Sequence, residues 1–404
     1  MRRADLTEAV RKTLERYQPP HDAHYGVVPT PPPLGALSLS AMPPNLAAAM
    51  RGLNTARVLT ATQPNHFALT RILVRQEAVT SSAIEGTHST LDAVLSADEN
   101  ESTNELTAAK EDTDTATTQV RDYALALEKA IVTVSAEGRA AFSRPMIEGL
   151  HRAVMSGDPD YKDEPGSIRD SVVWIGGGRD IGSSIFNPPP PGRVERCLAD
   201  HVDYLRDDGM SLMEQSIIAR LAVGHAHFEA VHPFRDGNGR VGRLLIPLMM
   251  AADGHTPLYI APYIAHQKDA YIAGLKDAQQ RLAYAPLIEF LSAAILATVE
   301  EAETTFAAIG QLAPVWAKRG KFRKGSAAMR ALGVLPGYPI VTARRLSNEL
   351  KLSFKSANEG IAQLVGAGVL TELTGHRRNR LFAARDVLRI FNRSFGEEPD
   401  LPEV

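Results

Sequence analysis

One short stretch of the 404-residue sequence brings together more side chains that can do chemistry than any other stretch of its length. It begins at His232, continues as Pro-Phe-Arg-Asp-Gly-Asn-Gly-Arg, and ends at Arg243. A histidine can serve as a general base, and Asp236 offers a hard oxygen ligand of the kind that Mg²⁺ accepts together with substrate phosphates. These residue types at this spacing indicate proton transfer beside a phosphate-bearing ligand.

The residues after Asp236 predict how such a ligand is held. A helix is expected over Arg240–Ala252, with Gly254 beyond it as a stop signal. Arginines in the first turn of a helix oppose the macrodipole, so they make sense there if an anion is bound. Glycines and the N–H groups of a first turn also bind phosphate. The expected phosphate-binding residues are Gly237, Asn238, Gly239, Arg240 and Arg243.

Two other interpretations of this stretch are open. In the first, His232 ends a helix, the glycines form an ordinary loop and the arginines are solvated. In the second, His225, His232 and Asp236 bind a metal ion, because the two histidines are seven residues apart and share a helix face. Neither interpretation uses the amide and the two arginines that follow Asp236, so phosphate binding is favoured.

The stretch matches the Fic-family signature HPFx(D/E)GNGRxxR at every defined position, and the chain therefore resembles Fic proteins. Most of these proteins transfer AMP from ATP to a hydroxyl side chain of a target protein. The resemblance implies that His232 removes the proton of a Tyr, Ser or Thr hydroxyl while its oxygen attacks the α-phosphorus and pyrophosphate leaves. It further implies ATP as substrate, Mg²⁺ held by Asp236, and a target protein as partner, which can be the chain itself.

The same resemblance assigns roles to the phosphate-binding residues. Backbone N–H groups of the glycines and the Asn238 side chain would stabilise charge on the α-phosphate, and the two arginines would clamp the outer phosphates. Removal of AMP from a modified protein and use of another nucleotide are alternatives at the same site. Gln267 and Lys268 stand where the family usually has Asn and Arg beside the adenine, so the preferred base stays open.

A second motif lies upstream, at Ser81 to Gly86. Ser81 and Glu85 are four residues apart on one helix face, and Gly86 suits the C-terminal stop of that helix. An ordinary helix end with a solvated glutamate explains this spacing equally well. The segment also matches the inhibitory motif (S/T)xxxE(G/N) of Fic proteins. That resemblance implies that Glu85 competes with the terminal phosphate of the nucleotide for Arg243.

A change of composition between Gly166 and Gly192 predicts a short β-hairpin. The sequence Ser-Val-Val-Trp-Ile precedes three glycines, and Ile-Phe-Asn precedes four prolines, which forbid continuation of a strand. In Fic proteins the corresponding flap pairs through its backbone with the target segment and holds the hydroxyl near the base. The expected target-binding residues are Val172, Val173, Trp174 and Ile175.

Helical periodicity predicts the elements that position these residues. A core helix over Glu214–Ala230 leads into His232, because its apolar residues recur at helical spacing at Ile217, Leu221, Phe228 and Val231. Pro247 is expected to kink the helix that follows. Elsewhere the pattern predicts an extended arm over 1–43, helices over 46–60 and 65–84 separated by Pro64, a polar connector over 95–118, and a helix that ends before Pro314.

The C-terminal region is basic, with 14 lysines and arginines against 4 acidic residues between Lys321 and Ser394. Its pattern of helix, turn, helix and hairpin over 342–382 predicts a winged helix. The candidate DNA-binding residues are Lys355 on the second helix and Arg377 and Arg378 on the wing. A DNA-binding regulator that senses nucleotide through the Fic domain is therefore an alternative function, and protein binding by the winged helix is another.

Length and composition set the expected organisation. The fold class is mainly α, with a helical Fic core, a small β-hairpin flap and a C-terminal winged helix. Three domains are expected: an N-terminal arm with helices over 1–115, the catalytic core over 116–312 and the winged helix over 313–404. Cys197 is the single cysteine, and no apolar run is long enough to cross a bilayer, so a cytoplasmic protein is expected. The target and the oligomeric state, including a homodimer, are left open.

Overall fold

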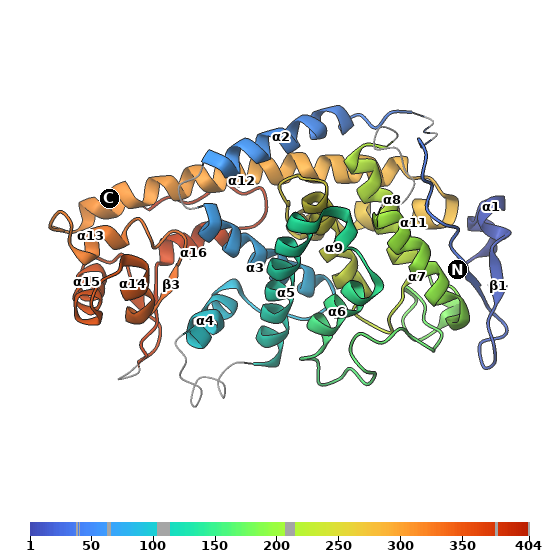
Figure 1. The fold of residues 1–404 in the computed structure, drawn as a ribbon, viewed down its shortest axis with the longest axis horizontal. Helices are drawn as coiled ribbons and strands as arrows, with labels where there is room; N and C mark the ends of the chain where they lie inside the picture. Colours follow the sequence, from blue (N-terminus) through green and yellow to red (C-terminus); the bar gives the residue numbers. More distant parts are fainter. Residues whose placement is uncertain are drawn as a thin grey trace. The chain divides into compact units, whose positions relative to one another are not determined.

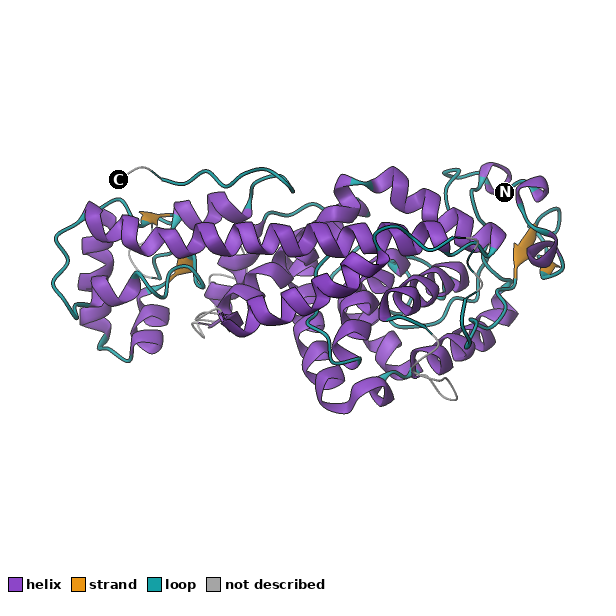
Figure 2. Cartoon of the chain, turned by 90° about the horizontal axis from the view of Figure 1, so that it is seen from above, coloured by secondary structure: helices purple, strands orange, loops and turns teal. Residues whose placement is uncertain are grey.

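The computed structural model describes residues 1–37, 39, 41–62, 66–102, 114–206, 215–375 and 379–402. Helices dominate these residues and the strands are short, so the prediction of a mainly helical fold is confirmed (Figure 2). The chain forms two compact units, Met1–Arg57 with Leu125–Leu296, and Val58–Ala124 with Ala297–Val404. Each unit thus combines two separate stretches of sequence (Figure 1). The division into three consecutive domains stays a prediction.

The first unit contains the motif that follows His232. Helices α2, α5 and α12 lie partly in this unit, because its boundaries fall within them. Its elements are η1 (Arg3–Asp5), α1 (Glu8–Arg11), β1 (Leu14–Arg16), β2 (Tyr25–Val27), α2 (Leu46–Thr62), α5 (Thr115–Glu137), η2 (Gly138–Ala141), α6 (Arg144–Met155), η3 (Ile181–Ser183), α7 (Pro191–Arg206), α8 (Ile217–Val231), α9 (Asn238–Ala252), α10 (Ala261–His266), α11 (Lys268–Arg281) and α12 (Ala285–Arg319).

Helix α8 is the centre of this unit, since all of its residues are buried. It packs against α7, α9 and α11 (Figure 1). The side chain of Ser216 caps it by accepting a hydrogen bond from the N–H of Ala219. The prediction of a core helix leading into His232 is confirmed, although its expected first residue, Glu214, lies outside the described residues. A helix buried on all sides is a rigid support for the residue at its end.

The N-terminal arm contacts the C-terminal end of the segment that is predicted as a flap. Strands β1 and β2 pair antiparallel, with Leu14 opposite Val27. The hydroxyl of Tyr17 donates to the carbonyl oxygen of Pro188 at 2.5 Å, and the N–H of Val27 donates to the carbonyl oxygen of Asn187 at 2.9 Å. Apolar residues from the arm, the flap and α8 form one small cluster, which consists of Leu6, Val10, Val27, Phe186 and Ala230.

The second unit contains α3 (His66–Ile84), α4 (Leu91–Ser102), α13 (Ala327–Ala331), β3 (Ile340–Val341), α14 (Ala343–Leu350), α15 (Phe354–Gly366), β4 (Thr371–Glu372), β5 (Phe382–Ala383) and α16 (Arg385–Phe391). The strands form an antiparallel sheet in the order β3-β5-β4. The predicted helices and hairpin are therefore present. Their assignment as a winged helix stays a proposal, and the turn residues 376–378 lie outside the described residues.

The predicted helix break at Pro314 is wrong, because α12 continues through this residue to Arg319. The residues of α12 beyond the proline are held by buried partners. Trp316 is fully buried, and its indole N–H donates to the carboxylate of Asp386 at 2.8 Å. Arg319 donates to the same carboxylate at 2.9 Å. Tertiary contacts thus offset the cost of about 3 kcal/mol that a proline imposes inside a helix.

The carboxylate of Glu99 on α4 connects the N-terminal and C-terminal stretches of the second unit. It accepts hydrogen bonds from Thr342, through the backbone at 3.1 Å and the hydroxyl at 2.8 Å, and from Arg345 at 3.0 Å. We expect Glu99→Ala to lower the free energy of unfolding by about 3 kcal/mol, since buried donors lose their acceptor. Urea denaturation of the full chain measures this, with the exposed Glu101→Ala as the control. Equal effects of the two variants would contradict it.

Candidate active site

His232 lies at the C-terminal end of α8 in the left-handed conformation, with φ of 48°. Its N–H donates to the carbonyl oxygen of Phe228 at 2.9 Å. On the imidazole, Nδ1 lies 3.3 Å from the carbonyl oxygen of Glu229 and 3.8 Å from its carboxylate. The side chain is 19% exposed, so the ring is reachable from solvent. A carboxylate beside Nδ1 orients the ring and stabilises the imidazolium that forms when Nε2 accepts a proton.

The loop after His232 is closed by the side chain of Asn238. The amide oxygen accepts from the N–H of Phe234 at 2.9 Å, and the amide nitrogen donates to the carbonyl oxygen of Phe234 at 2.8 Å. Gly237 has φ of 76°, and a Cβ on it would lie 2.7 Å from Sδ of Met155. Helix α9 begins at Asn238 rather than at Arg240, so the predicted start was two residues late. The glycines and Asn238 therefore shape the helix N-terminus.

Asp236 is exposed on this loop. One carboxylate oxygen accepts from the N–H of Gly237 at 2.6 Å, and the backbone oxygen of Asp236 accepts from His151. Within the described ranges, no group of three or more His, Cys, Asp or Glu side chains could hold a metal ion. A single exposed carboxylate nevertheless fits Mg²⁺ of the kind that takes most of its ligands from phosphates and water.

His151 on α6 packs against the loop that follows His232. Its Nδ1 accepts from the N–H of Gly166 at 2.8 Å, so Nε2 carries the proton and donates to the carbonyl oxygen of Asp236 at 3.0 Å. The ring stacks on Phe234 with centroids 3.8 Å apart. Burial lowers the pKa of His151 to about 4, so the ring is neutral at physiological pH. His151 is a lone helical histidine without a motif around it, so the sequence does not mark its contact with the loop.

The depressed pKa of His151 predicts a pH-dependent stability. An imidazole with a pKa near 6.5 unfolded and about 4 folded stabilises the fold fully above pH 6.5, and the contribution is lost as the pH falls towards 4. We expect a loss on the order of 3 kcal/mol across this range. Urea denaturation at pH 7 and pH 4.5 measures it, and His151→Gln should show a smaller difference between the two pH values. An unchanged difference would assign the effect to other buried histidines.

The two motif arginines are buried against different neighbours. Arg240 is 3% exposed, and its guanidinium lies 2.9 Å from Sδ of Met155 on α6. Arg243 is 2% exposed, and its charge adds to burial in lowering the pKa of His225 to about 3. His225 donates from Nδ1 to the carbonyl oxygen of Gly242 and accepts at Nε2 from a tyrosine hydroxyl. These contacts occupy both ring nitrogens, so they favour a structural His225 over a metal ligand.

Arg169 was not singled out in the sequence, yet it contacts the backbone on both sides of His232. Its guanidinium donates to the carbonyl oxygens of His232 at 2.7 Å and Val231 at 3.4 Å. It also donates to those of Ser171 at 2.9 Å and Pro189 at 2.8 Å. The side chain is buried, and burial lowers its pKa to about 10, so it remains a cation near neutral pH.

The flap, residues 171–189, contains one antiparallel bridge between Ile175 and Phe186 rather than the expected hairpin strands. The turn between them passes through three glycines with positive φ, and the indole N–H of Trp174 donates to the carbonyl oxygen of Gly178 at 2.9 Å. In the described part of the chain, no backbone hydrogen bond involves residues 172–174. Val172, Val173 and Trp174 therefore lie on a segment with unpaired backbone groups next to the bridge.

The upstream motif lies in the second unit, at the end of α3. Gly86 has φ of 89° and ends the helix, as predicted. Glu85 is exposed, whereas Ser81 is buried with its Oγ 3.2 Å from the hydroxyl of Tyr123. Arg243 belongs to the first unit. The competition between Glu85 and the nucleotide for Arg243 stays a prediction.

The candidate DNA-binding residues are only partly described. Lys355 lies in the first turn of α15 with its side chain 87% exposed, 4.0 Å from Glu359. Arg377 and Arg378 lie outside the described residues. Phe354 beside Lys355 is also exposed, so this helix end presents both apolar and charged groups.

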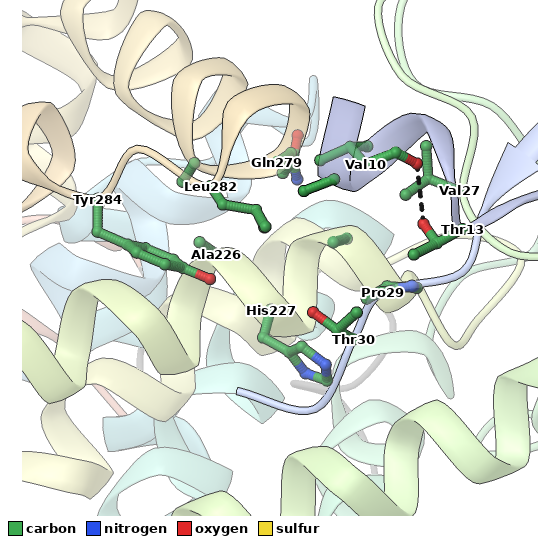
Figure 3. A pocket seen from close by; sticks show the side chains of 13 residues that line it. Val10, Thr13, Val27, Pro29, Thr30, Ala226, His227, Gln279, Leu282 and Tyr284 are labelled. Atoms are coloured by element: carbon green, nitrogen blue, oxygen red, sulfur yellow. Dashed lines mark hydrogen bonds between the residues drawn. The ribbon is translucent and has the colours of Figure 1, made fainter. Parts of the chain in front are cut away.

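A cavity of about 70 Å³ lies on another side of α8 (Figure 3). It is lined by the N-terminal arm, α8 and α11, with the rings of His227 and Tyr284 at its wall. Burial lowers the pKa of His227 to about 4. The cavity has room for a few water molecules but not for a nucleotide, and no residue of the His232–Arg243 stretch lines it.

No helix in the described ranges combines the length and apolarity that a membrane span requires.

Family models match two parts of this chain. Residues 141–250 match the Fic/DOC family, and residues 44–132 match the Fic/DOC family N-terminal model. The protein adenylyltransferase fic-1 of Caenorhabditis briggsae is 36% identical over 141 residues, which are 33% of this chain and 25% of that protein. The probable protein adenylyltransferase aq_aa38 of Aquifex aeolicus is 33% identical over 96 residues, 24% of this chain and 27% of that protein. The chain thus spans about a quarter of the length of these relatives.

The fold also has a solved counterpart. A Fic family protein from Desulfovibrio desulfuricans G20 superposes with a TM-score of 0.50 and 19% identity, covering 86% of this chain and 98% of that one. At this identity the likeness concerns the fold alone.

Proposed function

Because this chain carries a Fic domain preceded by the N-terminal region of the same family, we propose that it is a protein adenylyltransferase. It transfers AMP from ATP to a Tyr, Ser or Thr hydroxyl of a target protein and releases pyrophosphate. The observation that carries the proposal is the position of His232, which a buried helix presents one short loop before the N-terminus of α9. A base and an anion-binding helix end are thereby supplied by one stretch of the chain.

Each motif residue has a role in this reaction. His232 takes the hydroxyl proton at Nε2, with Glu229 beside Nδ1 to stabilise the resulting charge. The first N–H groups of α9, around Gly237 and Gly239, face charge that develops on the α-phosphate. Asp236 would hold Mg²⁺, which supplies neutralisation of phosphate charge when bound. Arg240 and Arg243 contribute positive charge to the outer phosphates, and Asn238 acts by closing the loop as well as through its helix-terminal N–H.

The flap supplies the docking edge for the target. Unpaired backbone groups at residues 172–174 can accept an extended target segment as an added strand. Such pairing places a hydroxyl without reading much side-chain sequence. Val172, Val173, Trp174 and Ile175 are the residues assigned to this contact.

Regulation is assigned to Ser81 and Glu85. Glu85 competes with the terminal phosphate for Arg243, so ATP binds in an unproductive pose until the glutamate is displaced. The buried hydrogen bond between Ser81 and Tyr123 supports this proposal, because it fixes the end of α3 that carries Glu85.

ATP labelled at one of two positions distinguishes this reaction from its alternatives. Purified chain with Mg²⁺ and cell lysate is given ATP labelled on the α-phosphorus or on the γ-phosphorus. Relative to lysate alone, we expect the chain to add a protein band with the α-label and none with the γ-label, since pyrophosphate leaves. Loss of label from AMP-modified protein would indicate the reverse reaction, and labelling only with another nucleotide would indicate a different donor. A γ-labelled band that appears only when the chain is added would contradict adenylyl transfer.

DNA binding by the C-terminal elements is a second candidate, favoured by their helix, helix and hairpin order and by their basic composition. We expect the full chain to retard random duplex DNA in a gel, with an affinity that falls steeply as salt rises. Lys355→Ala should weaken binding and reduce the salt slope by about one. No retardation at the lowest salt would exclude this function.

A further inference from the structure

We infer that Arg169 is a positioning residue that holds His232 and the flap in one fixed arrangement. This inference rests on the proposed function, because it concerns how the base meets the target hydroxyl. Arg169 contacts carbonyl oxygens at the two ends of the flap and at the end of α8. The residue itself is 4% exposed and lies two positions before the first flap residue.

The contacts between Arg169 and the end of α8 stabilise His232 in its strained left-handed conformation. A left-handed non-glycine residue costs on the order of 1–3 kcal/mol, so neighbouring contacts must hold His232 in that conformation. Arg169 bonds the carbonyl oxygens of Val231 and His232, which are acceptors left over at the C-terminus of α8. The backbone N–H of Arg169 donates to the carbonyl oxygen of Pro233 at 3.0 Å. Three consecutive residues around the base are therefore tied to one residue.

Arg169 also contacts both ends of the flap, the segment proposed to dock the target. Ser171 and Pro189 are the two ends of the flap, and their carbonyl oxygens accept from the same guanidinium. A movement of either end must therefore disturb the hydrogen bonds that hold His232. Target docking and alignment of the base are coupled through this single side chain.

The buried positive charge of Arg169 is balanced by backbone dipoles rather than by a carboxylate. No carboxylate in the described ranges lies within ion-pair distance of the guanidinium, although burying an unpaired cation is costly. The negative end of the α8 macrodipole and the four carbonyl oxygens offset this cost. A methionine of similar length would pack without that cost, so packing alone does not explain an arginine here.

Arg220 provides a matched control for the test. It is also 4% exposed and lies at the opposite end of α8, where its guanidinium sits 3.6 Å from Asp253. We expect Arg169→Lys to lower kcat for AMP transfer by about 100-fold, because an ammonium cannot reach both the flap and α8. The dissociation constant for ATP should stay within twofold of wild type. Arg220→Lys should leave kcat unchanged even where it lowers the melting temperature equally.

Hydrogen–deuterium exchange tests the same coupling without activity. In Arg169→Lys, exchange should accelerate together in peptides that cover residues 171–189 and 229–236, whereas Arg220→Lys should accelerate neither. If no form of the chain transfers AMP but this paired acceleration is seen, the proposed function fails and the positioning role stands. If Arg169→Lys keeps full kcat, or if only one of the two segments accelerates, the inference is overturned. Arg169→Met serves as a second variant should the lysine form fold poorly.

Discussion

Replacing His232 should reduce AMP transfer by about 10²–10⁴-fold, the range that a general base contributes. In the proposed reaction His232 takes the proton of the target hydroxyl, and no other described side chain is assigned to do so. Because His232 has φ of 48°, alanine at this position also adds backbone strain. We therefore expect His232→Asn, which tolerates the left-handed conformation but cannot take the proton, to be as inactive as His232→Ala.

The measurement is the rate of α-labelled AMP incorporation at saturating ATP. Both variants should bind ATP with nearly the wild-type dissociation constant, since the phosphate contacts are assigned to α9. His24→Ala, on the N-terminal arm and outside the motif, is the control for loss of a histidine. Activity in His232→Asn close to that of wild type would show that proton removal is not its role.

Replacing Glu85 should have the opposite effect. If its carboxylate occupies Arg243, then Glu85→Gly frees one charge-assisted contact worth about 1.5–3 kcal/mol to the nucleotide. Labelling should therefore rise by about 10- to 100-fold. The double variant Glu85→Gly with His232→Ala should label nothing, because release of inhibition still requires the base.

Glu137→Gly is the matched control for this prediction. Glu137 is exposed at the end of α5 and precedes Gly138, whose φ is 63°, just as Glu85 precedes Gly86. Both substitutions add backbone freedom at a helix end, but only one removes the proposed inhibitor. Equal stimulation by both would attribute the effect to flexibility, and no change in Glu85→Gly of an otherwise active protein would reject inhibition by Glu85.

The predictable parts of the site are those whose local structure is determined by residue type and spacing. His232 follows a helix whose apolar residues recur at helical spacing, and the loop after it depends on Gly237, whose φ is positive. Gly86 ends α3 for the same reason. In each case a backbone conformation or a buried face restricts which residue types fit, so the pattern can be recognised in the sequence.

The parts that were not predictable depend on main-chain partners or on distant packing. Arg169 bonds carbonyl oxygens up to 63 residues away, and every residue type offers such an oxygen, so nothing in the sequence marks the partners. Pro314 would break an isolated helix, but Trp316 and its buried acceptor hold the next turn in place. The β-branched residues of the flap predict strands, whereas its two halves pair with each other at a single bridge, between Ile175 and Phe186.

The reliance on main-chain acceptors also bears on how this architecture can diversify. Arg169 and Asn238 make their described hydrogen bonds to backbone atoms of the flap ends and the motif loop, not to side chains. Substitutions among residues 172–174 therefore leave those bonds intact while they change the surface offered to a target. Under the proposed function, mutation of these residues can change which target protein docks without disturbing the alignment of His232, so target selectivity and chemistry can evolve separately.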